Sequence, residues 1–188
     1  MKITRENLVA WGACKDGLDW FDEKFPNMEG DYQEILDSLA IDDKPNYARF
    51  LIKKAGPINS EIRLESINAK NFFFAGAVIV KKSIKVEIEI IAGLGIKAGD
   101  GIEAGDGIEA GDGIEAGLGI KAGCGIEAGL GIKAGWGIKA GCGIKAGDEF
   151  GIFAGIKVKI KDWEVEAKVI AKSQPKNLIS GHFQEKTK

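Results

Sequence analysis

The feature that most constrains the fold is a six-residue repeat in the middle of the chain. From Ile90 to Gly143 the sequence follows the pattern Ile-x-Ala-Gly-x-Gly nine times in succession. The second position is Lys or Glu in every copy but the first, whereas the fifth is Asp, Leu, Cys or Trp. A short, regular period of this kind predicts a stacked solenoid, in which each repeat contacts only its neighbours.

Apolar and polar residues alternate through the repeat and beyond it, from Ile84 to Ile160. Period two indicates β-strands with one buried face, and the glycines, which make up one residue in three, exclude a helix. The Gly-x-Gly steps are the only candidates for corners, because glycine tolerates the positive φ that tight corners need. We therefore expect a mainly β fold, a parallel β-helix of short Ile-x-Ala strands.

The number of hexads in one coil decides the cross-section of this solenoid. Three hexads give a triangular prism in which Cys124 stacks on Cys142, 18 residues later. Two hexads give a flatter body that aligns Cys124 with Asp112 and Trp136. Known hexapeptide β-helices favour the triangle. The pattern does not give the handedness of the coil.

The hexad frame also extends beyond the nine exact copies. Before them, Ile67, Phe73 and Ile79 keep the spacing, with a one-residue slip ahead of Ile84; after them come Phe150 and Ile156. We expect the solenoid to occupy residues 57–161. Residues 162–188 would then form a closing strand, beginning at Trp163, that covers the open end, followed by a polar tail.

Residues 1–56 have the pattern of a small acidic helical domain. Thr4 can cap a first helix, and Asp31 with Glu34 resembles a capping box. Pro45 suits the first turn of the last helix, and Gly56 suits its end. The expected core residues are Trp11, Trp20, Phe21, Ile35, Leu39, Phe50 and Leu51.

Charged residues within the repeat are the main candidates for a binding surface. An evenly spaced acidic ladder can imitate a phosphate backbone, and a basic ladder can bind one. The simpler alternative is that these residues only keep exposed strands soluble. The acidic ladder consists of Asp100, Glu103, Asp106, Glu109, Asp112 and Glu115. The basic ladder consists of Lys133, Lys139, Lys145, Lys157 and Lys159.

The residues in the fifth position have several interpretations. Strict alternation would point Asp100, Asp106 and Asp112 inward, where an unpaired carboxylate is costly. Either the corner turns them out to water, or they bind a cation or a partner. Cys124 and Cys142 are expected to be small core fillers. Trp136 would be either a core residue or an exposed binding aromatic.

Nothing in the sequence indicates catalysis. The one histidine, His182, lies in a polar segment, and no Ser/His/Asp set, metal-ligand spacing or nucleotide fingerprint is present. The solenoid also lacks the histidine that hexapeptide-class acetyltransferases place between coils. We expect no enzymatic activity, no cofactor and no metal.

The net charge and the lack of a signal sequence bear on the cellular location and the partners that we expect. The net charge of −2 gives no support to direct nucleic-acid binding. The sequence has no secretory signal and no apolar run long enough for a membrane span. Its three cysteines are odd in number and unclustered, which speaks against a secreted disulfide framework. We expect a cytoplasmic protein without membrane contacts.

The N-terminal segment LVAWGACKDGLDWFDEKFP, joined to GIEAGDGIEAG repeats, resembles a family of uncharacterised bacterial and phage-associated repeat proteins. The resemblance implies a helical head on a repeat body and no established activity. Together with the acidic Asp/Glu segment, the phage-like association favours a non-enzymatic protein-binding module, specifically an inhibitor of a host defence complex of the anti-CRISPR type. Such an inhibitor would act by steric block or nucleic-acid mimicry. The alternative is a structural solenoid that self-assembles into an oligomer or filament.

Overall fold

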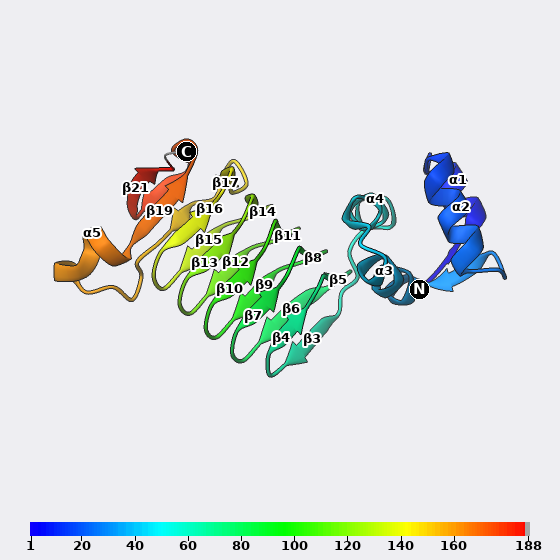
Figure 1. Ribbon diagram of the computed structural model, residues 1–188, viewed down its shortest axis with the longest axis horizontal. Coiled ribbons are helices and arrows are strands. Elements are labelled where there is room, and N and C mark those ends of the chain that lie inside the picture. Colours follow the sequence, from blue (N-terminus) through cyan, green and yellow to red (C-terminus); the bar gives the residue numbers. More distant parts are fainter. Residues whose placement is uncertain (187–188) are drawn as a thin grey trace.

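A computed structural model describes residues 1–186 and shows a helical head at one end of a parallel β-solenoid (Figure 1). The head contains four helices and a short antiparallel pair of strands, β1 with β2. These elements are β1 (Lys2–Thr4), α1 (Arg5–Ala10), α2 (Lys15–Lys24), β2 (Glu29–Asp31), α3 (Tyr32–Ile41) and α4 (Pro45–Ala55). Within residues 1–186, no helix is both long and apolar enough to cross a membrane.

The helix boundaries in the head follow the predicted capping residues. Thr4 caps α1 in a reciprocal capping box with Asn7, and Asp31 caps α3 by accepting from the Gln33 amide. The reciprocal box therefore lies at α1, not at α3, where the Glu34 spacing had suggested it. Gly56 ends α4 with a φ of 81°, a conformation that glycine adopts without strain.

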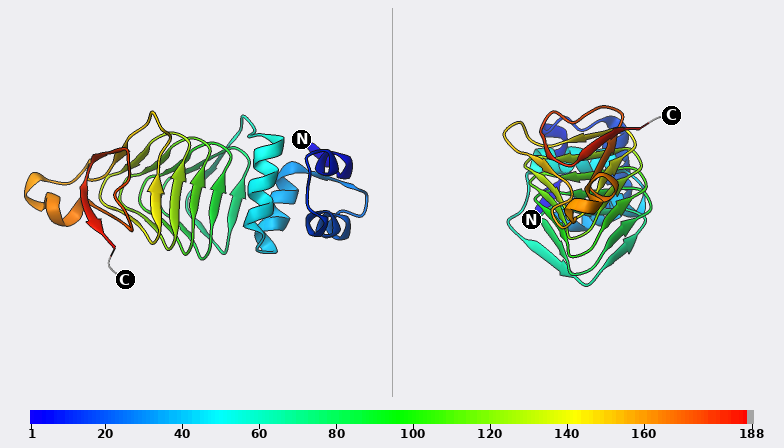
Figure 2. Two further views of the ribbon diagram at one scale, coloured as in Figure 1. Left: turned by 90° about the horizontal axis from the view of Figure 1, so that it is seen from above. Right: turned by 90° about the vertical axis from the view of Figure 1, so that its left-hand side faces the viewer.

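Three parallel sheets form the solenoid, one on each side of a triangular prism (Figure 2). Sheet 1 contains β3 (Glu61–Leu64), β6 (Ala77–Val80), β9 (Ile96–Ala98), β12 (Ile114–Ala116), β15 (Ile132–Ala134), β18 (Ile152–Phe153) and β20 (Leu178–Ser180). Sheet 2 contains β4 (Ile67–Ala69), β7 (Ile84–Val86), β10 (Ile102–Ala104), β13 (Ile120–Ala122), β16 (Ile138–Ala140), β19 (Lys168–Ala171) and β21 (His182–Glu185). Sheet 3 contains β5 (Phe72–Phe74), β8 (Ile90–Ala92), β11 (Ile108–Ala110), β14 (Gly125–Ala128) and β17 (Gly143–Lys145).

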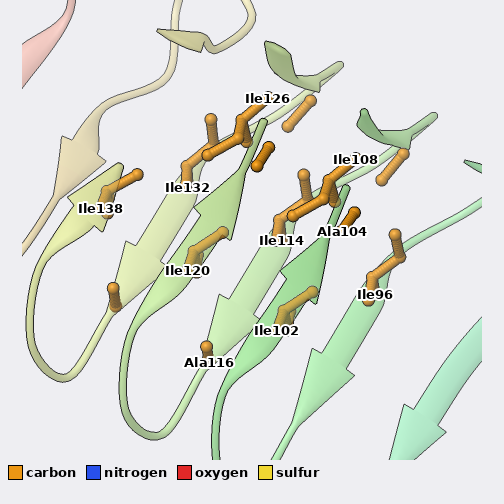
Figure 3. Close-up of a cluster of buried hydrophobic side chains, with 14 of the residues drawn as sticks. Ile96, Ile102, Ala104, Ile108, Ile114, Ala116, Ile120, Ile126, Ile132 and Ile138 are labelled. Carbon is orange, nitrogen blue, oxygen red and sulfur yellow. The ribbon is translucent and has the colours of Figure 1, made fainter. Parts of the chain in front are cut away.

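The register confirms three hexads in each coil. Ile102 pairs with Ile84 below it and with Ile120 above it, each 18 residues away. The Ile and Ala of each strand therefore stack on their counterparts inside the prism and form one continuous apolar core (Figure 3). The residue between them points outward, as period two requires.

The fifth position departs from the predicted alternation, because the corner turns its side chain out of the core. Along the repeat, Ile and Ala are at most 7% exposed, whereas the corner residues are exposed or half-buried. Two interior residues in each hexad fill the narrow prism, which leaves no room for a third. Asp100 and Asp106 thus reach water, and Cys124 and Cys142 are exposed, so the prediction that these cysteines fill the core was wrong.

The predicted register was also wrong outside the exact copies. At the N-terminal end, Phe72 and Val78, not Phe73 and Ile79, align with the interior isoleucines. The slip therefore falls between Ile67 and Phe72, five residues apart. Phe73 instead faces the head and is buried against it, together with Ala75 and Ile91.

At the C-terminal end, Ile152 takes the interior place that Phe150 was expected to fill. Phe150 and Ile156 are exposed, because two additional residues lengthen the corner before β18. A projecting arm of residues 155–167 follows; it contains a short 3-10 turn (Ile160–Asp162) and α5 (Trp163–Glu166). The expected closing strand from Trp163 is thus a helix, and β19, β20 and β21 continue the parallel stack.

Candidate functional site

The outward side chains of the solenoid define three faces and three corner columns. Backbone hydrogen bonds join corner residues 18 apart, for example from the Trp136 amide to the Leu118 carbonyl (3.1 Å). The column between sheets 1 and 2 contains Asp100, Leu118 and Trp136. The column between sheets 2 and 3 contains Asp106, Cys124 and Cys142. The column between sheets 3 and 1 contains Asp112 and Leu130.

The predicted acidic ladder does not lie on one face. Its six residues span a single coil and therefore encircle the prism, with one Asp at each corner and one Glu on each sheet. A phosphate-like array would need acids stacked in one column, but the column of Glu103 continues with Lys85 and Lys121. The structure thus spreads these residues apart.

Each glutamate of the acidic ladder also has a cationic neighbour. Lys121 donates to Glu103 at 2.6 Å, and Lys97 lies 3.3 Å from Glu115. Glu109 accepts from Arg49 of α4 at 2.5 Å. The hydrogen bond from Lys121 lowers the pKa of Glu103 below its ordinary value. The Lys–Glu pairs stabilise the register between neighbouring coils. Together with Arg49 they leave little unpaired negative charge on the three faces.

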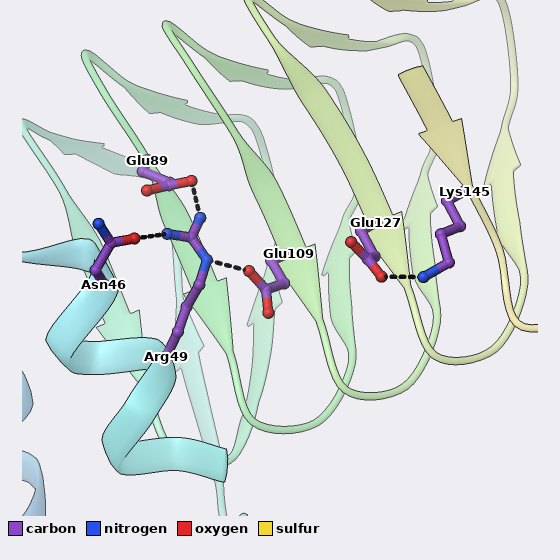
Figure 4. Close-up of polar contacts among 6 residues, drawn as sticks. All are labelled: Asn46, Arg49, Glu89, Glu109, Glu127 and Lys145. Atoms are coloured by element: carbon purple, nitrogen blue, oxygen red, sulfur yellow. Dashed lines mark hydrogen bonds and ion pairs between the residues drawn. The ribbon is translucent and has the colours of Figure 1, made fainter. Parts of the chain in front are cut away.

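The predicted basic ladder is dispersed in the same way. Lys133, Lys139 and Lys145 project from sheets 1, 2 and 3, respectively. Lys145 pairs with Glu127 at 2.7 Å (Figure 4). Lys157 and Lys159 belong to the projecting arm rather than to a strand. The two ladders therefore do not form a continuous charged surface.

No metal site is present among residues 1–186, where no group of three His, Cys, Asp or Glu side chains could hold an ion. Asp100, Asp106 and Asp112 occupy three different corners, so one cation cannot bridge them. His182 is exposed on β21.

The exposed apolar side chains of the solenoid, in contrast, gather at the end away from the head. A shallow groove on sheet 1 is lined there by Leu130, Phe150 and Phe153. Ile179 and Phe153 both pack over Gly151, where each side chain would lie 2.7 Å from an added Cβ. The opposite edge of sheet 1 carries two further exposed residues, of which Trp136 is 47% exposed. We call this set the distal patch: Leu118, Leu130, Trp136, Phe150, Phe153 and Ile179.

The outer face of sheet 3 is occupied by the head near its N-terminal end. Arg49 of α4 bonds to Glu89 and Glu109, and also to Asn46 at 3.3 Å (Figure 4). Burial raises the pKa of Glu89, and this effect outweighs the opposing charge of Arg49. The nearby Phe73 and Ile91 join the core of the head. The first coils of this face therefore attach the head.

A second apolar feature is a pocket between the helices of the head. Its volume is about 280 Å³, and Leu8, Trp20 and Phe50 contribute to its walls. Three of the predicted core residues, Trp11, Trp20 and Phe50, are only half-buried, and the last two line this pocket. Aromatic and aliphatic groups dominate the pocket, and Cys14 and Tyr47 are the ionisable residues in its lining.

The comparisons with known proteins concern the head. Residues 1–55 match the family described as the YdhT N-terminal domain. This match covers less than a third of the chain. Searches among curated proteins and among solved structures found no match. The chain is thus a parallel β-solenoid whose N-terminal region is similar to that domain.

The distal patch was missed in the sequence because the apolar residues of the fifth position were not assigned to the surface: the cysteines were expected in the core, and Trp136 was left between core and surface. The signal was available in the variability of that position. Asp, Leu, Cys and Trp differ too much in size and polarity to share one site in a closely packed core. A position that accepts all four indicates a surface, and its Leu and Trp residues then mark where that surface is apolar instead of charged.

Proposed function

We propose that the protein is a non-enzymatic protein-binding module that engages its partner through the distal patch on sheet 1. The observation that carries this proposal is the set of exposed apolar side chains along the distal part of sheet 1, with Phe150 at one edge and Trp136 at the other. Exposed apolar groups that gather on one face are typical of interaction sites, and aromatic residues dominate binding hot spots. A rigid prism would present such a patch with little loss of backbone freedom.

For an inhibitor of a host defence complex, steric block is the mode of action that we propose. Nucleic-acid mimicry would require a column of unpaired acids, whereas Glu103, Glu109 and Glu115 lie on separate faces and are paired with cations. A solenoid bound through sheet 1 would place the head and the remaining faces against neighbouring parts of the complex.

The corner columns supply a substitution that suits the fold. Asp112 lies one coil below Leu130, and Asp100 lies two coils below Trp136. Leu130→Asp combined with Trp136→Asp thus places Asp in two corner columns that each contain an Asp already, so the double variant should fold. Cys142→Asp is the matched control, because its column contains Asp106 and it lies away from sheet 1.

Pull-downs from nuclease-treated bacterial lysate in reducing buffer, quantified by mass spectrometry, test the proposal. Wild type and Cys142→Asp should retain the same partner, and the double variant should lose it at least tenfold. Equal retention by the double variant, with circular dichroism showing that it is folded, would contradict the proposal.

Self-assembly is the second candidate, and the projecting arm favours it. Ile160 is 94% exposed and Val165 is 66% exposed at the C-terminal end of the molecule, opposite the acidic head (Figure 2). An arm of one copy that contacts the head of the next would form a heterologous, open-ended assembly. Light scattering should then show a mass that rises with concentration, and Ile160→Asp should abolish the rise. A constant monomer mass would remove this candidate.

A further inference from the structure

Two of the three cysteines meet at one corner of the prism. Cys124 and Cys142 occupy consecutive coils of the column between sheets 2 and 3, and their flanking residues Gly125 and Gly143 are register partners. The Cys142 amide donates to the Cys124 carbonyl at 2.6 Å. The two Sγ atoms lie 2.7 Å apart, and both side chains are exposed.

This geometry is suited to a disulfide. Neighbouring strands are about 4.8 Å apart, which lies within the range of Cα separations that disulfides span. The parallel register fixes both Cβ atoms on the same side of the corner, so little backbone movement is needed for the sulfurs to bond. Exposure gives a small-molecule oxidant access to either thiol.

We propose that Cys124 and Cys142 form a reversible disulfide that links two successive coils of the solenoid. The oxidant is a small-molecule disulfide such as oxidised glutathione. One cysteine thiolate attacks it, forms a mixed disulfide and releases one glutathione thiol. The second cysteine thiolate then displaces the other glutathione thiol, so the two cysteines lose two electrons and two protons in total. A dithiol reductant reverses the reaction.

The link would hold the C-terminal coils together. Sheet 3 ends at β17, which begins directly after Cys142. The chain that leaves β19 stacks on this corner, where the Lys172 amide donates to the Cys142 carbonyl. A covalent ring across one coil reduces the freedom of the unfolded chain. Unfolding from the C-terminal end would then be slower in the oxidised protein than in the reduced one.

Cys14 provides an internal control, since it is also exposed but lies alone in the head. The full chain is incubated with oxidised or reduced glutathione at pH 8, and trypsin cleavage follows under conditions that prevent exchange. Lys133 and Lys139 separate the two cysteines, so the proposal predicts a linked pair of peptides, residues 122–133 with 140–145. Cys14 should carry a glutathione adduct or remain free.

The stability of the chain gives a second readout. Oxidation should raise the melting temperature by about 5–10 °C in wild type and in Cys14→Ser, and should have no such effect in Cys142→Ser. Because Cys142 is an exposed corner residue, Cys142→Ser should remain folded, which circular dichroism checks. Glutathione adducts at similar levels on all three cysteines, without the linked peptides, would overturn the proposal.

Discussion

The two glycines of each hexad have different surroundings. A Cβ on the first glycine, such as Gly123, would lie closer than 3.0 Å to a backbone carbonyl of the coil below, here that of Gly105. A Cβ on the second glycine would have more room: it would lie 3.3 Å from a carbonyl oxygen of the coil above at Gly101, 3.1 Å at Gly113 and an ordinary 3.9 Å at Gly125. The sequence had suggested a positive φ at these corners, but this was wrong. Among residues 1–186, the glycines with positive φ all lie outside the repeat. The first glycine is thus required by the close stacking of the coils.

Gly123→Ala should therefore destabilise the protein by about 1–3 kcal/mol, the usual cost of forcing an extra carbon into a packed site. Gly125→Ala should change the free energy of unfolding by less than about 0.5 kcal/mol, because the added methyl group has space. Urea unfolding of the two variants, which differ only in which neighbour of Cys124 is changed, compares them directly. Equal effects would show that stacking does not distinguish the two positions.

At the scale of the elements, the guanidinium of Arg49 is the polar link between α4 and sheet 3. The carboxyl of Glu89 is only 9% exposed, and Arg49 is the cation that neutralises it. Burial disfavours the charged form of Arg49, but the carboxylates of Glu109 and Glu89 outweigh this effect and raise its pKa. The stability of this contact therefore depends on whether Glu89 is ionised.

Because the pKa of Glu89 is raised in the folded state, its ionisation costs stability as the pH rises through that pKa. Arg49→Met removes the charge that opposes this rise, so the pKa of Glu89 should increase further. The variant should lose about 2–3 kcal/mol at pH 7, a value reduced for the partial exposure of Arg49, and less towards pH 4.5.

Urea unfolding of Arg49→Met at pH 7 and pH 5 measures this dependence. The control is Arg49→Met with Glu89→Gln, which cannot ionise at that site and should show a smaller difference between the two pH values. A loss that is identical at both pH values in Arg49→Met would contradict the account of a buried, ionisable Glu89.

At the scale of the whole molecule, the head and the solenoid share one apolar cluster. Phe73, Ala75 and Ile91 of the first coils pack with Leu36 and Leu51 of the helices. Hydrogen bonds reinforce the contact, among them one from Gln33 Nε2 to the Phe73 carbonyl at 2.8 Å. The solenoid thus begins against the head, and α3 covers the edge of sheet 3 that β5 would otherwise leave open at this end (Figure 1).

The predictable part of this architecture is the part with the exact repeat. Between Ile90 and Ile144 the repeated hexads impose one register, so the parallel coil and its Ile/Ala core followed from the spacing. The spacing alone left two or three hexads in each coil, and only the analogy with hexapeptide β-helices favoured the triangle. At the ends, the chain replaces the hexad by five-residue and eight-residue steps, as from Ile67 to Phe72 and from Ile144 to Ile152. Packing against the head and the projecting arm determines those steps. Neither interaction can be inferred from the six-residue period.

The candidate site was less predictable than the fold. The charged residues were identified correctly as outward on the strands, but their grouping was wrong, because residues six apart lie on different faces and only residues 18 apart form a column. The distal patch depends in addition on Phe150, Phe153 and Ile179, which come from irregular segments after the repeat. Their meeting could be seen only once the three-dimensional path of the chain was known.

The most direct test of the proposed binding face is photo-crosslinking from two outward positions in the same part of the prism. A photoreactive phenylalanine analogue replaces Phe153 on sheet 1 or Lys139 on sheet 2. After irradiation in bacterial lysate, the account predicts a specific protein adduct from position 153 and at least tenfold less of it from position 139. Equal adducts from both positions, or an adduct from position 139 alone, would contradict binding through the distal patch.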